Sequence, residues 1–206
     1  MPSEKPFSIS VSDHEISLLR QRLALAHFPS ELDGDDKLQG PPLADIKRLV
    51  QRWSSGFDWR AQEAMLNAEL PQFTRDIDVD GFGTLNIHYI HKKSIVKGAI
   101  PLLFVHGWPG SFIEVRKILP LLVSASEGEP SFHVVALSLP GFGFSEGPKK
   151  TGFKMAQYAE VRASIFLVTS ATEYLYGNQV ANKLMISLGY DEYGNVHATF
   201  HLTWGI

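Results

Sequence analysis

The chain contains no cysteine among its 206 residues. It therefore has no disulfide framework, thiolate metal site or cysteine nucleophile, a composition that suits a reducing compartment. Blocks of lysine and arginine are also absent and the formal net charge is -3, so we expect no binding to nucleic acid or to an anionic membrane surface. The polar N-terminal residues include no apolar segment typical of a signal peptide or membrane anchor, which favours a cytoplasmic location.

The first part of the chain is predicted to be helical. Hydrophobic residues make up 44% of the whole sequence, enough for the chain to bury a core. Apolar residues recur at helical spacing from Ser12-Asp13 towards Pro29, again over 43–53, and again over 59–70, where Pro71 ends the pattern. These helices form a predicted N-terminal region, residues 1–75.

The second part of the chain is predicted to contain a sheet. From Thr74 the period of the apolar residues changes to two, which predicts a hairpin with its turn at residues 80–83. Apolar runs over 102–105 and 132–139 flank a helical pattern over 112–122. This strand, helix, strand order predicts parallel strands covered by helices on both faces. Another helix is expected from Met155.

The segment after the first apolar run is the most informative one. The run ends abruptly in His106-Gly107-Trp108, followed by Pro109 and Gly110. A buried strand that ends in this way delivers free backbone N–H groups to a site, and chemistry that builds negative charge on oxygen needs such donors. We predict that the N–H of Trp108 is a donor and that His106 and Gly107 support the loop, with His106 as a structural hydrogen-bonding residue rather than a base.

Four sequence blocks, in order, resemble the epoxide hydrolases of the microsomal-like branch of the α/β-hydrolase superfamily, including their N-terminal extension. The blocks are Pro6-Phe7 through Arg22-Leu23 with Pro29; Phe57-Asp58-Trp59-Arg60 through Leu70-Pro71-Gln72-Phe73; residues 87–94 with 106–112; and residues 138–145. The resemblance implies an α/β fold, with an incomplete α/β-hydrolase sheet over residues 76–193 preceded by a helical extension over residues 1–75.

The resemblance also implies an activity, the hydrolysis of a small-molecule epoxide to a vicinal diol without a metal or an organic cofactor. In that family an Asp carboxylate opens the ring to give an alkyl-enzyme ester. A His with an acidic partner then activates water to hydrolyse the ester, and two lid tyrosines bind the epoxide oxygen. The position that supplies an oxyanion N–H matches Trp108.

Two segments depart from the family pattern. Residues 162–180 interrupt what would be one continuous helix, and within them we expect Phe166, Leu167 and Val168 to be disordered or prone to aggregation. The tail, residues 194–206, stands where the family has the Gly-Gly-Asp-Trp-Gly segment with the nucleophile. We hypothesise that both segments are translated introns. The nucleophile, acid, catalytic His and lid are absent, so this chain is predicted to be inactive.

Other residues invite a catalytic or metal-binding interpretation. Gly143-Phe144-Ser145-Glu146-Gly147 matches the elbow of serine hydrolases, but Ser145 follows Pro140-Gly141 rather than a strand, so we favour a loop residue. Asp191 and Glu192 lack the context of a nucleophile. His197 and His201 have no third ligand nearby, which argues against a metal site. His88 and His91 show no partner in the sequence, and we interpret them as solvent-facing or loosely packed.

Two alternative functions stay open at this point. The same oxyanion loop serves esterases and dehalogenases, although the block at residues 57–60 weighs against them. The chain could instead be a non-enzymatic truncated product whose incomplete sheet exposes an edge, which would favour a homo-oligomer.

Overall fold

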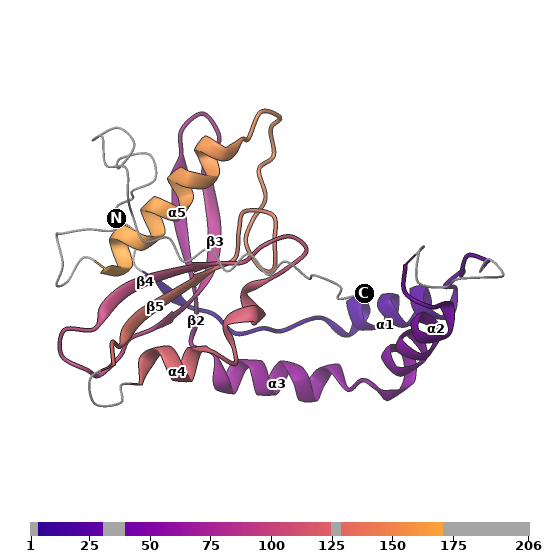
Figure 1. Cartoon of the computed structure of the whole chain (residues 1–206). Helices are drawn as coiled ribbons and strands as arrows, with labels where there is room; N and C mark the ends of the chain where they lie inside the picture. The colour runs from indigo at the N-terminus through magenta and orange to yellow at the C-terminus, as the bar shows by residue number, and fades with distance from the viewer. Residues whose placement is uncertain (1–3, 31–39, 125–128, 171–206) are drawn as a thin grey trace. The chain divides into compact units, whose positions relative to one another are not determined.

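The computed structural model describes residues 4–30, 40–124 and 129–170 (Figure 1). The chain forms two compact units. One is the extension unit, Ile9–Ala68. The other is the sheet unit, which comprises Met1–Ser8 and Glu69–Ile206. Among the described residues, no helix has the length and apolar character needed to cross a membrane.

The extension unit contains three helices, in agreement with the sequence pattern. They are α1 (Asp13–Ala24), α2 (Leu43–Gln51), which continues into the π-helical turn η1 (Arg52–Gly56), and α3 (Trp59–Glu69). Helix α1 begins at the predicted site, because Ser12 caps the helix and forms a capping box with Glu15. It ends at Ala24, before the expected limit at Pro29.

An extended segment before α1 is fixed to α3 by polar side chains of that helix. The backbone N–H of Ile9 donates to Asn67 Oδ1 at 2.8 Å, and Asn67 Nδ2 donates back to Ile9 O at 2.8 Å. The N–H of Val11 donates to Glu63 Oε1 at 2.7 Å. These side chains replace a strand partner and satisfy backbone groups that would otherwise be buried without one.

The sheet unit contains a mixed five-stranded sheet in the order β1-β2-β3-β5-β4. Its strands are β1 (Lys5–Pro6), β2 (Gln72–Val79), β3 (Gly83–Lys92), β4 (Ile100–Val105) and β5 (Phe132–Leu137). Strands β2 and β3 form the predicted hairpin, with Ile77 opposite Leu85. Strands β4 and β5 pair in parallel and in register, so the predicted βαβ unit is confirmed.

Both faces of this sheet are covered, because helices α4 and α5 lie on opposite sides of it (Figure 1). On one face, alternate residues of β2, β3 and β5 pack with Val161 and Ile165 of α5 (Met155–Ser170). On the other face, β5 contacts α4 (Leu119–Val123) and η2 (Phe112–Val115). This arrangement buries His88, Ile90, Val134 and Ala136 completely.

The helix predicted over 112–122 is instead divided into the 3-10 turn η2 and the short helix α4. The reason is Pro120. Proline has no N–H to donate to the carbonyl four residues earlier, and its ring clashes with that carbonyl. A new helix can nevertheless begin with proline in its first turn, which is where α4 places Pro120.

Helix α5 continues to Ser170 without a change of conformation at Arg162. The expected disorder of Phe166, Leu167 and Val168 is therefore wrong for the backbone, which is helical there. The sequence from Met155 to Ser170 contains neither glycine nor proline, so nothing in it stops a helix. Residues 171–180 and the tail, residues 194–206, lie outside the described residues.

Candidate active site

The loop after β4 presents an unbonded backbone donor. The N–H of Trp108 makes no hydrogen bond to any other described residue, and the residue as a whole is 83% exposed. The peptide bond between Trp108 and Pro109 is cis. An N–H in this position is free to bind an acceptor from outside the loop.

His106 holds this loop from inside the sheet unit. The side chain is buried, with its Nδ1 2.9 Å from Gly107 O and its Nε2 3.2 Å from the backbone nitrogen of Leu139. A backbone N–H can only donate, so Nε2 is the acceptor, and Nδ1 carries the ring hydrogen and donates to Gly107 O. Both ring nitrogens are therefore occupied, and His106 links the loop after β4 to the loop after β5.

Gly110 and the start of η2 complete the loop. A Cβ atom at Gly110 would overlap Glu114 Oε1 and would lie 2.8 Å from Gly107 O, so only glycine fits there. Glu114 Oε1 accepts the N–H of Ser111 at 3.1 Å, and Ser111 Oγ accepts the N–H of Ile113 at 3.4 Å. This capping box fixes the exit from the loop.

His88 lies behind this loop, fully buried, which corrects the interpretation that it is solvent-facing or loosely packed. Its Nδ1 is 2.8 Å from Ser138 Oγ and its Nε2 is 3.1 Å from Gln72 Oε1. The ring makes edge contacts with three aromatic rings, at centroid distances of 4.9 Å to Phe7, 4.7 Å to Phe112 and 5.4 Å to Phe144. Burial lowers the pKa of His88 to about 4, so the imidazole is neutral at neutral pH.

Ser145 is a structural residue of the loop after β5, as the sequence context predicts. Its Oγ accepts the backbone N–H of His88 at 2.9 Å and donates to Ser138 O at 2.7 Å. The hydroxyl is buried and has no base within hydrogen-bonding distance among the described residues. A serine nucleophile needs an adjacent base, so this geometry does not form a serine hydrolase elbow.

The interpretation of His91 is likewise corrected. His91 lies on the opposite face of β3 and is 8% exposed, with Nδ1 3.1 Å from Glu4 Oε2. The same carboxylate oxygen accepts from Tyr89 Oη at 3.0 Å and faces the guanidinium of Arg75 at 3.9 Å. Burial lowers the pKa of His91, although Glu4 opposes this effect, and burial raises the pKa of Tyr89 to about 12.

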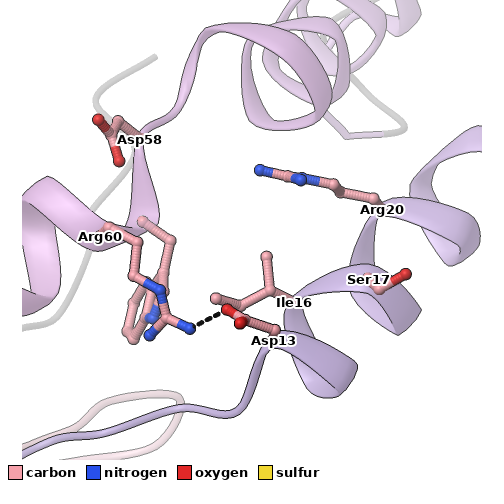
Figure 2. A pocket seen from close by; sticks show the side chains of 7 residues that line it. Asp13, Ile16, Ser17, Arg20, Asp58 and Arg60 are labelled. Atoms are coloured by element: carbon pink, nitrogen blue, oxygen red, sulfur yellow. Dashed lines mark hydrogen bonds and ion pairs between the residues drawn. The ribbon is translucent and has the colours of Figure 1, made fainter.

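A hollow of about 200 Å³ lies at the start of α1 and α3 in the extension unit (Figure 2). The guanidinium of Arg60 pairs there with Asp13 and also with Glu63, at 2.6 Å. The N–H of Val11 and Arg60 lower the pKa of Glu63. These contacts hold α1 against α3, and the hollow contains none of the catalytic residues predicted from the sequence.

The predicted site residues His106, Gly107 and Trp108 thus lie together in one loop, whereas Asp191, Glu192, His197 and His201 lie outside the described residues. Sequence reasoning missed the partners of His88. The signal that could have found them is the alternation in β3, where Ile87 and Tyr89 point to one buried face and His88 must therefore point to the other.

Comparisons with known proteins agree on one family. The family profile "Epoxide hydrolase N terminus" matches residues 4–115, and the profile "alpha/beta hydrolase fold" matches residues 100–169. Epoxide hydrolase 1 of Sus scrofa is 36% identical over 184 residues, covering 85% of this chain and 39% of the relative. Juvenile hormone epoxide hydrolase 2 of Ctenocephalides felis is 36% identical over 163 residues, covering 77% of this chain and 34% of the relative.

Solved structures give the same result. The epoxide hydrolase of Aspergillus niger matches with a TM-score of 0.69 and 32% identity over 81% of this chain and 43% of that one. The juvenile hormone epoxide hydrolase of the silkworm Bombyx mori matches with a TM-score of 0.69 and 28% identity over 82% of this chain and 44% of that one. The chain spans less than half the length of these relatives. With more than half of its residues matched by the profile of the N-terminal region, the chain belongs to the epoxide hydrolase family of the α/β-hydrolase superfamily.

Proposed function

We propose that this chain supplies the oxyanion-binding part of an enzyme that hydrolyses small-molecule epoxides to vicinal diols. The observation that carries the proposal is the free N–H of Trp108 in a loop fixed by His106 and Gly110. Family membership supports the chemistry, in which a carboxylate nucleophile forms an alkyl-enzyme ester that water then hydrolyses.

The second step is the one that uses the N–H of Trp108. Attack of water on the ester carbonyl moves negative charge onto the carbonyl oxygen, and a preorganised N–H stabilises that charge without reorganisation. Loss of one such donor commonly lowers the rate by roughly 10²–10³. His106 and Gly107 act through the loop and do not exchange protons with substrate in this proposal.

The 206 residues contain no Gly-Gly-Asp-Trp-Gly segment, and we propose that the chain by itself does not turn over epoxides. Oxyanion donors without a nucleophile have no ester intermediate to stabilise. The purified chain, incubated with an aryl epoxide, should produce diol at the background rate of the buffer. Diol formation above that background, in a preparation free of other hydrolases, would overturn this part of the proposal.

Sequencing the transcript is the first step in testing the role of the Trp108 N–H. A transcript that lacks the codons for residues 162–180 and 194–206 and encodes the nucleophile segment would supply a product to assay. A transcript that retains both segments would defeat the hypothesis that they are introns. Replacement of Trp108 in that product by its α-hydroxy acid analogue removes the N–H, weakens Gly107 O as the acceptor of His106, and should slow ester hydrolysis by roughly 10²–10³. The matched control, Trp108→Phe, keeps the N–H and should lose far less. Equal losses in both variants would contradict the role of the N–H.

Esterase or dehalogenase activity is the second candidate. Haloalkanes and esters belong in the same assay as the epoxide, because the oxyanion loop is common to all three reactions. The hydrogen bonds that occupy Ser145 weigh against a serine esterase.

We also propose a cytoplasmic location, from the cysteine-free composition.

Homo-oligomer formation is a separate proposal. Strand β4 is the last strand of the sheet among the described residues, with Ile100 46% exposed. An apolar edge of this kind pairs readily with another chain. Size-exclusion chromatography with light scattering at several concentrations distinguishes a monomer from an assembly.

A further inference from the structure

The packing behind the Trp108 loop forms a continuous series of contacts that begins at His88. His88 Nδ1 bonds Ser138 Oγ at 2.8 Å. The residue after Ser138 is Leu139, whose N–H donates to His106 Nε2 at 3.2 Å. His106 in turn donates to Gly107 O at 2.9 Å, and the N–H of Trp108 belongs to the same peptide group as this carbonyl.

The tautomers agree along this series. The Nδ1 of His106 carries its ring hydrogen, as the donor from Leu139 requires. In His88, Gln72 Oε1 is an acceptor next to Nε2, which places the ring hydrogen on Nε2 and leaves Nδ1 to accept from the Ser138 hydroxyl. The hydroxyl of Ser138 can therefore donate to Nδ1 of His88 only if the His88 ring is neutral.

A second contact connects His88 with the other end of the same loop. Its ring packs at 4.7 Å against Phe112, the first residue of η2 and the residue that follows Ser111. A Cβ atom at Gly143 would lie 3.0 Å from Ser138 Oγ and 3.4 Å from Phe112 Cδ1, so there is little room for either side chain to move. His88 thus contacts Phe112 at the exit of the loop directly, and it contacts Ser138, the neighbour of the Leu139 that bonds His106 at the entry.

We propose that His88 is a positioning residue for the oxyanion loop, acting through Ser138 and Leu139 on His106 and through Phe112 on the start of η2. The inference rests on the proposed function, since that function gives the N–H of Trp108 a ligand. The ring contacts of His88 come from Phe7, Gln72, Phe112, Ser138 and Phe144, all uncharged. Protonation of the ring would remove the acceptor of the Ser138 hydroxyl.

The test measures the loop directly and needs no enzymatic activity, so its failure is distinguishable from failure of the proposed function. Amide hydrogen exchange of the full chain is followed by NMR for Leu139 and for a reporter in the core, Val135. The variants are Ser138→Ala, which removes the hydroxyl, and His88→Gln. His91→Gln is the matched control, because His91 is a buried histidine of the same strand on the opposite face of the sheet.

In Ser138→Ala the protection of the Leu139 amide should fall by about tenfold or more relative to that of Val135. This is the effect expected when the hydrogen bond between Ser138 and His88, which supports this segment, is lost. The amide resonance of Trp108 should shift in the same variant, and in the unmodified chain it should follow the titration of His88. If His88→Gln does not fold, Ser138→Ala carries the test. Unchanged Leu139 protection in Ser138→Ala, or an equal selective loss in His91→Gln, would overturn the inference.

Discussion

Acidification should destabilise the sheet unit before any carboxylate titrates, because His88 is neutral and buried in the folded chain. Its pKa is about 4 when folded, against an ordinary value of 6.5. Between these values the unfolded chain binds one more proton, so stability is complete above pH 6.5 and falls as the pH is lowered. The loss amounts to about 2 kcal/mol at pH 5 and about 3 kcal/mol at pH 4.

Other groups titrate with the same sign but at different pH. His91 also has a lowered pKa and adds to the loss below its ordinary value. Glu69, Asp76 and Glu146 have lowered pKa values, so their contributions are lost only as the pH falls below about 4.5. Between pH 7.5 and 5, the change in the free energy of unfolding therefore comes from the histidines.

Urea denaturation of the unmodified chain, His88→Gln and His91→Gln at several pH values between 7.5 and 5 measures this effect. The free energy of unfolding should change by about 2 kcal/mol less between pH 7.5 and 5 in His88→Gln than in the unmodified chain, provided that the variant folds. An NMR titration of the His88 ring gives the folded pKa independently. Constant stability of the unmodified chain between pH 7.5 and 5, or a His88 pKa near 6.5, would refute the reasoning.

Three further predictions concern packing. Gly110→Ala should displace Glu114 from its capping box and cost about 1–3 kcal/mol in urea denaturation, whereas Gly107→Ala, with open space around the new methyl group, should cost much less. Ser145→Ala should destabilise the chain by about 1–3 kcal/mol by leaving two buried backbone groups without their partner, and a fluorophosphonate probe should not label the unmodified chain at this serine. Glu63→Gln should increase exchange of the Val11 amide, because a carboxylate acceptor is replaced by a weaker one, without changing exchange in the sheet.

Patterns of short range were sufficient to predict much of the fold. The capping box at Ser12 depends only on a residue three positions later, and the β2–β3 hairpin depends on alternation around one turn. The parallel pairing of β4 and β5 follows from two apolar runs that flank a helical segment. Each of these signals lies within a few tens of residues, where periodicity is informative.

Contacts between distant residues could not be predicted in this way. Phe7 and Phe144 enclose His88 although they are far from it in sequence, and Glu4 faces Tyr89 and His91 across more than eighty positions. A single sequence gives no means of pairing such residues. The division of the helix at Pro120 was missed for a different reason, because the apolar period continues across a residue that the backbone cannot accommodate.

The topology also indicates where a nucleophile would have to come from. Strand β4 runs parallel to β5 and ends at Val105, immediately before the Trp108 loop. Parallel strands place their carboxyl ends at the same edge of a sheet, and ligands of open α/β sheets bind outside that edge. A strand that joined the sheet beside β4 in the same direction would therefore bring the turn that follows it next to the N–H of Trp108. His106 and Gly110 already fix the Trp108 loop without that strand, so under the proposed function the nucleophile would be added without rebuilding the loop.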